Sequence, residues 1–336
     1  MKHNTTFCIL VLFIMVLVPV SGCGTSNNAI VFPDSYVEDA IRLTLNQPEG
    51  AISQEKLAKL TKLDLSGWFI QDVTVLEHCN NLVDLDLSTN EITDISPLSS
   101  LKKLETLNLS LNPVSDLSPL AECTGLKNLI IMDTNISDLT PLANLTGMET
   151  LYLVYNKIKS LHGLENMVNL TLLHLAANEI SDITPLTNLT SLQNLDLGQI
   201  SQGTSFPGGD LSSSTIEIKV IGIEDLTPLS NLKNLSELYL DARLIDDVSP
   251  LASLRSLEIL QLRYNEIVDT SPLTGLKKLK TLKLDANPIT DLEAWTHYIP
   301  SEGQSLTIRL EDCSLNEKSI LTCIPAMEEA GIWVSR

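Results

Sequence analysis

The chain has 336 residues, of which 43% are apolar but only 4% are aromatic, so its core must consist almost entirely of aliphatic side chains. It carries 42 acidic and 22 basic residues, which gives a formal net charge of −20. This charge disfavours contact with phosphate backbones and with anionic membrane surfaces, so nucleic acid is not an expected partner.

The N-terminal segment has the features of an export signal. Lys2 precedes an apolar run over residues 7–20, which is shorter than the roughly 20 residues that a membrane-spanning helix requires. The run ends in Val20-Ser21-Gly22-Cys23, which resembles the lipobox of bacterial lipoproteins. The resemblance implies a signal peptide over residues 1–22, a lipid on Cys23 that anchors the protein to a cell membrane or outer membrane, and a tether over residues 23–31. The alternative is ordinary signal cleavage nearby, which would leave Cys23 as an unpaired thiol.

Residues 32–59 are predicted to form a helical N-terminal cap. One helix follows Asp34, and a second short helix begins at Ser53 and runs through Leu60. The apolar face of the first helix consists of Val37, Ala40, Ile41 and Leu45. The two helices should cover the open edge of the first strand of the repeats that follow.

Residues 60–304 repeat at a period of 22. Each unit begins with Leu and has apolar residues at offsets 3 and 5, Asn at offset 8, and Ile or Val at offset 10, which matches the leucine-rich-repeat pattern. The cleanest copies begin at Leu82, Leu104, Leu170, Leu257 and Leu279. Counting partial copies, units begin at residues 60, 82, 104, 126, 148, 170, 192, 213, 235, 257, 279 and 305.

The repeat predicts an α/β fold, a right-handed leucine-rich-repeat solenoid shaped like a horseshoe. Residues at offsets 2–6 should form a short strand, and successive strands should stack in parallel about 4.8 Å apart as one concave sheet. Short helices should line the convex side. Residues 305–336 should supply the last repeat and a C-terminal cap, with a strand over residues 306–310, a helix from Leu315 and a helix end at Gly331.

Polar residues also recur in the repeat. The offset-8 asparagines are expected to turn inward and to satisfy buried backbone groups. Each Ser/Thr-Pro-Leu segment, such as Ser96-Pro97-Leu98, is expected to supply a helix N-cap followed by the first helical residue. The Asp two residues earlier should form local turn hydrogen bonds. A calcium site is the alternative, but one carboxylate per unit forms no clustered cage, so no metal or other cofactor is expected.

The 22-residue period with its Asp94-Ile95-Ser96-Pro97-Leu98 half resembles the internalin family and other bacterial repeats of that subtype, over roughly residues 32–336. Together with a patch of outward side chains on the sheet, the resemblance implies that the protein binds another protein, for example in adhesion to a host or neighbouring cell. The protein is also expected to be monomeric, extracytoplasmic and not an enzyme. The alternative is a structural envelope protein without a dedicated ligand.

The offset-4 side chains should point outward from the concave sheet, and their character changes along it. The column consists of Asp64, Asp86, Asn108, Ile130, Tyr152, His174, Asp196, Glu217, Tyr239, Gln261, Lys283 and Arg309. Exposed apolar side chains that gather on one face indicate a contact surface. The predicted partner-binding residues are Ile130, Met132, Tyr152, Val154, Tyr155 and His174, with Tyr239, Arg263 and Tyr264 as a second contact.

A surface hydrolase is the weakest alternative. Tyr152, His174 and Asp196 are lateral neighbours that could act as nucleophile, base and orienting group. A phenol is a poor nucleophile at neutral pH, however, and an open sheet offers no oxyanion donors. No catalytic residue is therefore assigned.

The repeat is irregular in the middle of the chain. Ile200, Ile221 and Arg243 replace the offset-8 Asn in three consecutive units. Residues 198–214 are rich in turn formers and are expected to leave the solenoid as a loop. Such a loop is either a binding element or a decayed repeat.

The cysteines of the repeats are expected to be structural. Cys79 and Cys123 fill the same inward position two units apart, about 10 Å, which is too far for a disulfide, so both should be free and buried. Cys313 takes the offset-8 position, and its pairing with Cys323 remains an open alternative.

Overall fold

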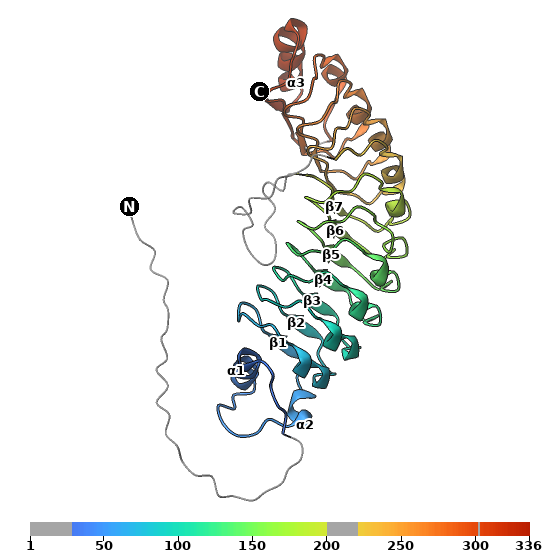
Figure 1. The fold of residues 1–336 in the computed structure, drawn as a ribbon. Coiled ribbons are helices and arrows are strands. Elements are labelled where there is room, and N and C mark those ends of the chain that lie inside the picture. The colour runs from blue at the N-terminus through green and yellow to red at the C-terminus, as the bar shows by residue number, and fades with distance from the viewer. Residues whose placement is uncertain (1–28, 200–220, 302) are drawn as a thin grey trace, which may run out of the picture.

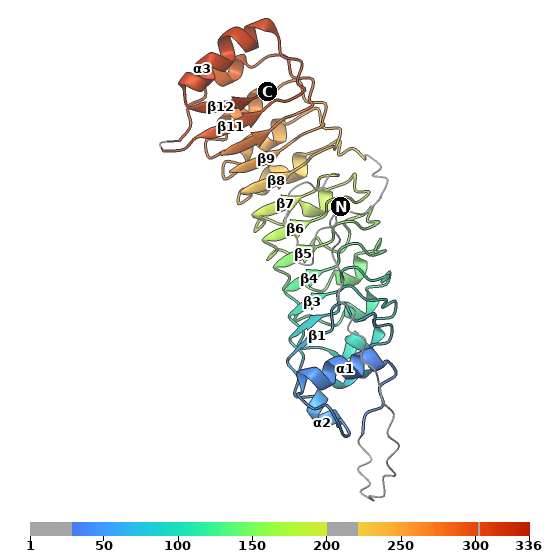
Figure 2. The ribbon, with the colours of Figure 1, turned by 90° about the vertical axis from the view of Figure 1, so that its left-hand side faces the viewer.

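The computed structural model describes residues 29–199, 221–301 and 303–336, and within these ranges the strands form one twelve-stranded sheet in sequence order. The sheet confirms the predicted leucine-rich-repeat solenoid: strands line the inner side of a curved, elongated molecule, and short helices line the outer side (Figure 1, Figure 2). The strands are β1 (Lys62–Asp64), β2 (Asp84–Asp86), β3 (Thr106–Asn108), β4 (Asn128–Ile130), β5 (Thr150–Tyr152), β6 (Leu172–His174), β7 (Asn194–Asp196), β8 (Glu237–Tyr239), β9 (Ile259–Gln261), β10 (Thr281–Lys283), β11 (Leu306–Arg309) and β12 (Ile332–Ser335).

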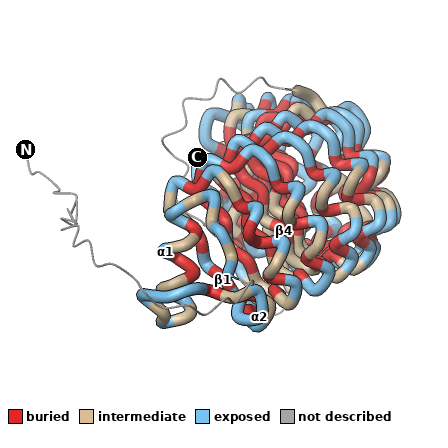
Figure 3. Tube along the Cα trace, turned by 60° about the horizontal axis from the view of Figure 1, so that its bottom comes forward, coloured by how far each residue is buried: buried red, intermediate tan, exposed pale blue. Residues whose placement is uncertain are grey.

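The strands pair in parallel, one repeat against the next, so that equivalent residues lie side by side. Leu63 pairs with Leu85, and Leu85 pairs with Leu107. These central strand residues point inward and are buried, and the residues on either side of them face the concave surface. Figure 3 shows the buried positions gathered inside the coil and the exposed positions on its turns. Burial of one aliphatic ladder along the whole molecule is therefore what stabilises the stack.

Short 3₁₀ helices line the convex side. They are η1 (Thr74–His78), η2 (Ser96–Ser100), η3 (Ser118–Leu120), η4 (Thr140–Leu142), η5 (Thr184–Leu186), η6 (Thr227–Asn231), η7 (Ser249–Ser253), η8 (Ser271–Gly275) and η9 (Glu293–His297). The prediction that the hydroxyl residue is the N-cap is wrong, because Ser96 is already the first residue of η2. Instead, the Asp94 carboxylate accepts a hydrogen bond from the Ser96 backbone N–H at 2.8 Å. Asp116, Asp138, Asp182, Asp225, Asp247 and Asp269 accept the equivalent bond, which confirms their predicted turn role.

The offset-8 asparagines have their predicted structural role. Asn90 Nδ2 donates to the carbonyl oxygens of Leu65 at 2.7 Å and Leu87 at 2.9 Å, and its Oδ1 accepts from the Ile70 N–H at 3.0 Å. The equivalent long-range bond is donated by Asn112, Asn156, Asn178, Asn265 and Asn287. Each amide thus satisfies buried backbone groups of two neighbouring units.

Between β7 and β8 the sheet departs from the predicted repeat. Asn194 on β7 pairs directly with Glu237 on β8, a step of 43 residues. The unit predicted to begin at residue 213 therefore adds no strand between them. Its outward residue Glu217 lies outside the described residues, as do Ile200 and most of the segment 198–214. The sheet instead gains β12 from the C-terminal cap, which pairs with β11.

Helical segments cap both ends of the described solenoid. In α1 (Ser35–Thr44), Val37, Ala40 and Ile41 are buried, and the Asp34 carboxylate accepts from the Tyr36 N–H as the N-cap. The second helix, α2 (Gln54–Leu57), is shorter than predicted. At the other end, the π-helical turn η10 (Ser319–Cys323) leads into α3 (Ile324–Glu329), which is followed by Gly331 with φ 85°. Of the helices described, none has the length and apolar character needed to cross a membrane.

The described cysteines are free thiols. Cys79 and Cys123 are buried, as predicted, and Cys313 and Cys323 do not form the disulfide that the sequence left open. Burial raises the pKa of the Cys79 thiol to about 12. Cys313 occupies the offset-8 position, where its Sγ donates to the Leu284 carbonyl oxygen at 3.3 Å.

Candidate binding surface on the concave sheet

The predicted contact surface on β4–β6 rests on its own small apolar cluster, separate from the main core. We call it the apolar zone; it consists of the buried residues Met132, Val154 and Ala176 and, packed against them, Ile130, Tyr152 and Tyr155. The prediction that Met132 and Val154 are exposed is wrong, since their exposed fractions are 1% and 0%. They lie beneath the partly exposed side chains rather than beside them. Ile130, Tyr152 and Tyr155 are thus the zone's accessible face, held on a packed base.

His174 lies next to this zone but is less accessible than predicted. Its ring contacts the edge of the Tyr152 ring, with the two centroids 4.9 Å apart, and only 5% of the residue is exposed. Burial lowers the pKa of His174, although its hydrogen bond with Asn194 opposes this shift. Burial therefore favours the neutral imidazole, whose ring packs against that of Tyr152.

In the lateral line of Tyr152, His174 and Asp196, the last two side chains each bond to a group outside the line. His174 Nε2 lies 2.9 Å from the Asn194 side-chain oxygen, whereas the Asp196 carboxylate accepts from the Gly198 N–H. Burial also raises the pKa of Tyr152, which makes its phenolate still harder to form. The arrangement suits hydrogen bonding and packing rather than nucleophilic chemistry.

Polar side chains continue the surface across β7 and β8. Asn194 Nδ2 and the Tyr239 hydroxyl both donate to Glu237 Oε2, each at 2.8 Å. Burial and this hydrogen bond raise the pKa of Tyr239. Tyr239 is therefore a neutral, oriented residue whose ring is partly exposed.

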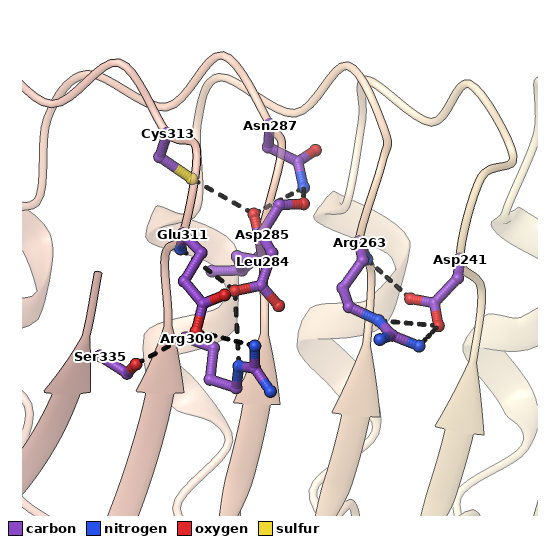
Figure 4. Close-up of polar contacts among 9 residues, drawn as sticks. All are labelled: Asp241, Arg263, Leu284, Asp285, Asn287, Arg309, Glu311, Cys313 and Ser335. Carbon is purple, nitrogen blue, oxygen red and sulfur yellow. Dashed lines mark hydrogen bonds and ion pairs between the residues drawn. The ribbon is translucent and has the colours of Figure 1, made fainter. Parts of the chain in front are cut away.

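The predicted second contact continues onto the β9 unit. The Arg263 guanidinium makes two hydrogen bonds to Asp241 Oδ2, at 2.7 and 3.2 Å, and this pair is drawn in Figure 4. The neighbouring Tyr264 is 53% exposed. The structure thus brings Tyr239, Arg263 and Tyr264 onto two adjacent units, several strands away from the apolar zone.

Two charged residues near the 43-residue step are buried. Asp196 is 3% exposed, and desolvation raises its pKa to about 7. Arg243 is fully buried in the offset-8 position, where it donates to the carbonyl oxygens of Leu197, Ile180 and Ile221. Desolvation lowers the pKa of Arg243 to about 10. Among the described residues, no group of three His, Cys, Asp or Glu side chains is placed to hold a metal ion.

Sequence reasoning missed one feature of the concave face. Lys283 and Arg309, on β10 and β11, are direct cross-strand partners, and Arg263 lies nearby on the β9 unit. The signal was present as successive cations at outward positions of the last three units. Of the three cations, only Arg263 was predicted as a contact, because Tyr and Arg together are the types that interfaces favour.

Comparison with known proteins places the repeat among characterised structures. Residues 80–122 and 255–297 match the family model described as leucine-rich repeats in two copies. An internalin of Listeria monocytogenes shares 29% identity over 90% of this chain and 95% of that chain, with a TM-score of 0.68. Internalin C2 of the same organism shares 30% identity over 74% of this chain and 92% of that chain, with a TM-score of 0.53. A leucine-rich-repeat protein of Leptospira interrogans shares the fold. It has 22% identity over 82% of this chain and 73% of that chain, with a TM-score of 0.63. No curated protein matches the chain significantly.

Proposed function

Because this chain belongs to the internalin-like family of leucine-rich-repeat proteins, we propose that it is a lipid-anchored cell-surface module that binds a partner protein on its concave face. The observation that carries this proposal is the apolar zone. Ile130, Tyr152 and Tyr155 hold apolar surface toward solvent on a packed base, whereas a surface without a ligand rarely gathers such side chains. Adhesion to a host or neighbouring cell is the role that we propose.

The export and anchoring of the protein are part of the same proposal. Residues 1–22 act as a signal peptide, and Cys23, which lies outside the described residues, carries the lipid. The protein then stands on the outer side of a membrane with its concave face accessible. The second contact, Tyr239, Arg263 and Tyr264, extends the same surface, because aromatic residues and Arg are the types that interfaces favour.

The substitution Tyr155→Asn tests the apolar zone. Tyr155 has φ 56°, in the left-handed region that Asn tolerates better than most residues, so the backbone should not change. Loss of an aromatic anchor typically costs about 2 kcal/mol, which weakens binding about thirtyfold. The measurement is crosslinking capture of surface partners from intact cells by the wild type and the variant, with thermal unfolding measured in parallel.

Leu111→Asn is the matched control, because Leu111 holds the same repeat position with φ 58° but lies outside the apolar zone. Capture should survive this change. Equal capture by both variants would move the recognition surface elsewhere, with residues 198–214 as the next candidate. If even the wild type captures no partner, the structural envelope protein becomes the better explanation.

A further inference from the structure

Three cationic side chains meet on the concave face near its C-terminal end. Lys283 on β10 pairs directly with Arg309 on β11, and Arg263 lies two residues beyond Gln261, the other cross-strand partner of Lys283. We call Arg263, Lys283 and Arg309 the cationic zone. Figure 4 shows the Arg263 and Arg309 side chains on the same face of the sheet, in front of the strands.

Two carboxylates of this region, Asp241 and Asp285, lie deeper than Lys283 and Arg309. The Asp241 side chain is 3% exposed and is held by Arg263, and the Asp285 side chain is 8% exposed and lies 3.5 Å from Arg309. The Arg309 side chain is itself 37% exposed. Glu311 is an exposed acid at the rim, 2.8 Å from Arg309. Lys283 and Arg309 are thus partly accessible to solvent, with Glu311 as an exposed acid beside Arg309, in a chain that carries −20 overall.

The Lys283 ammonium takes part in no ion pair or hydrogen bond with the residues that the structure describes. The Lys283 residue is partly buried, with Arg309 beside it on β11 and Arg263 on the β9 unit. Desolvation and repulsion by Arg263 and Arg309 lower the pKa of Lys283. The buried carboxylates of Asp241 and Asp285 offset this effect only in part, so a carboxylate arriving from outside would add counter-charge for Lys283.

We propose that the cationic zone binds an acidic side chain of the partner protein, with Lys283 as its main contact. This inference rests on the proposed function, because it specifies the chemistry of that partner. The exposed Tyr264 beside Arg263 offers aromatic surface of the kind that protein interfaces use. A long polyanion would be repelled by the remaining acidic surface, so a short acidic protein segment fits better.

The test uses the soluble full-length protein carrying Cys23→Ser, with fluorescein-labelled octaglutamate as the probe and octaglutamine as the uncharged control. Fluorescence anisotropy at low salt should show binding of octaglutamate alone. Lys283→Gln should weaken that binding about tenfold, because it removes a partly desolvated charge contact. Glu311→Gln should strengthen it several-fold, because Glu311 competes with the probe for Arg309.

Lys280→Gln is the matched control, since Lys280 is exposed, lies three residues from Lys283 and loses the same formal charge. An equal loss in both lysine variants would reduce the effect to general electrostatics and overturn the proposal. A second outcome would also overturn the proposal. If sulfate displaces octaglutamate more strongly than chloride does at equal ionic strength, the zone is a small-anion site instead. If octaglutamate fails to bind while Tyr155→Asn still abolishes capture, only this inference falls and the proposed function stands.

Discussion

Arg243 shows how one residue can replace a repeated hydrogen-bonding device. The asparagine ladder works over short separations: Asn265 reaches the Leu240 carbonyl 25 residues earlier. At the 43-residue step, Arg243 instead reaches carbonyl oxygens 46 and 63 residues earlier, those of Leu197 and Ile180. A longer side chain with several donors can satisfy acceptors on more than one unit. The missing Asn was visible in the sequence, but the bonds that replace it depend on which units become neighbours.

Asp196 provides a prediction about pH and stability. The pKa of Asp196 is about 7 in the folded state and roughly 3.9 in the unfolded state. The contribution of its protonated form to stability is therefore fully present below about pH 4, and it is lost as the pH rises toward 7. Asp196→Asn keeps an acceptor for the Gly198 N–H and cannot ionise. We expect it to exceed the wild type in free energy of unfolding at pH 8.5 by on the order of 1–3 kcal/mol, with a smaller difference at pH 5.5.

Urea unfolding at both pH values checks this, with Asp246→Asn as an exposed control that undergoes the same chemical change. The control should show no pH-dependent gain. A variant that is less stable than the wild type at pH 8.5 would mean that Arg243 holds Asp196 ionised after all.

The candidate site was predicted in part at the residue scale. The 22-residue frame placed Ile130, Tyr152 and Tyr155 on the concave side, where they are partly exposed. It could not reveal that Met132 and Val154 are covered, because the covering side chains belong partly to neighbouring strands. Burial on an open sheet depends on lateral packing, which the pattern within one unit does not encode.

At the scale of elements, the strands and convex turns could be predicted because each unit repeats the same local signals. The exception is the unit expected at residue 213. Its spacing was nearly regular, but β7 pairs with β8 directly. Whether a weak repeat enters the sheet depends on how its apolar residues compete with the next unit for the same edge, and this competition involves the whole stack.

The convex turn after β5 leads to another prediction. This unit lacks the Ser/Thr-Pro-Leu segment, and the turn uses Gly163 with φ 108°. A Cβ atom there would lie 2.2 Å from the Leu139 carbonyl oxygen, so Gly163→Ala combines a clash with backbone strain. We expect it to lower the free energy of unfolding by about 2 kcal/mol or more.

Gly147→Ala is the matched control, because a Cβ at Gly147 would meet backbone atoms at 3.8 and 3.9 Å, ordinary contact distances. Denaturant unfolding of both variants should separate them by more than about 1 kcal/mol. Similar stability for the two would mean that the turn can relax away from Leu139.

At the scale of the whole molecule, the proposed lipid on Cys23 predicts where the protein is found. Cys23→Ser removes the thiol that would carry the lipid, and acyl chains supply most of the membrane affinity of such an anchor. We expect the variant to move from the membrane fraction to the soluble fraction and to lose acyl groups in mass spectra of its N-terminal peptide. Cys79→Ser, a change of the same type at a buried position, should leave this partitioning unchanged. Membrane retention of the Cys23 variant would show that the anchor lies elsewhere.

The regular ladder of strands also sets a size requirement for any ligand. Tyr152 on β5 and Lys283 on β10 are separated by five strand spacings of about 4.8 Å, or about 24 Å along the sheet. A ligand that touches both must span that length, which corresponds to about 16 residues of α-helix or seven of extended chain. Extended peptides shorter than about seven residues can therefore occupy one end or the other, and a longer element or a folded domain is needed to engage both ends together. The stacking of the units thereby selects ligands by length as well as by chemistry.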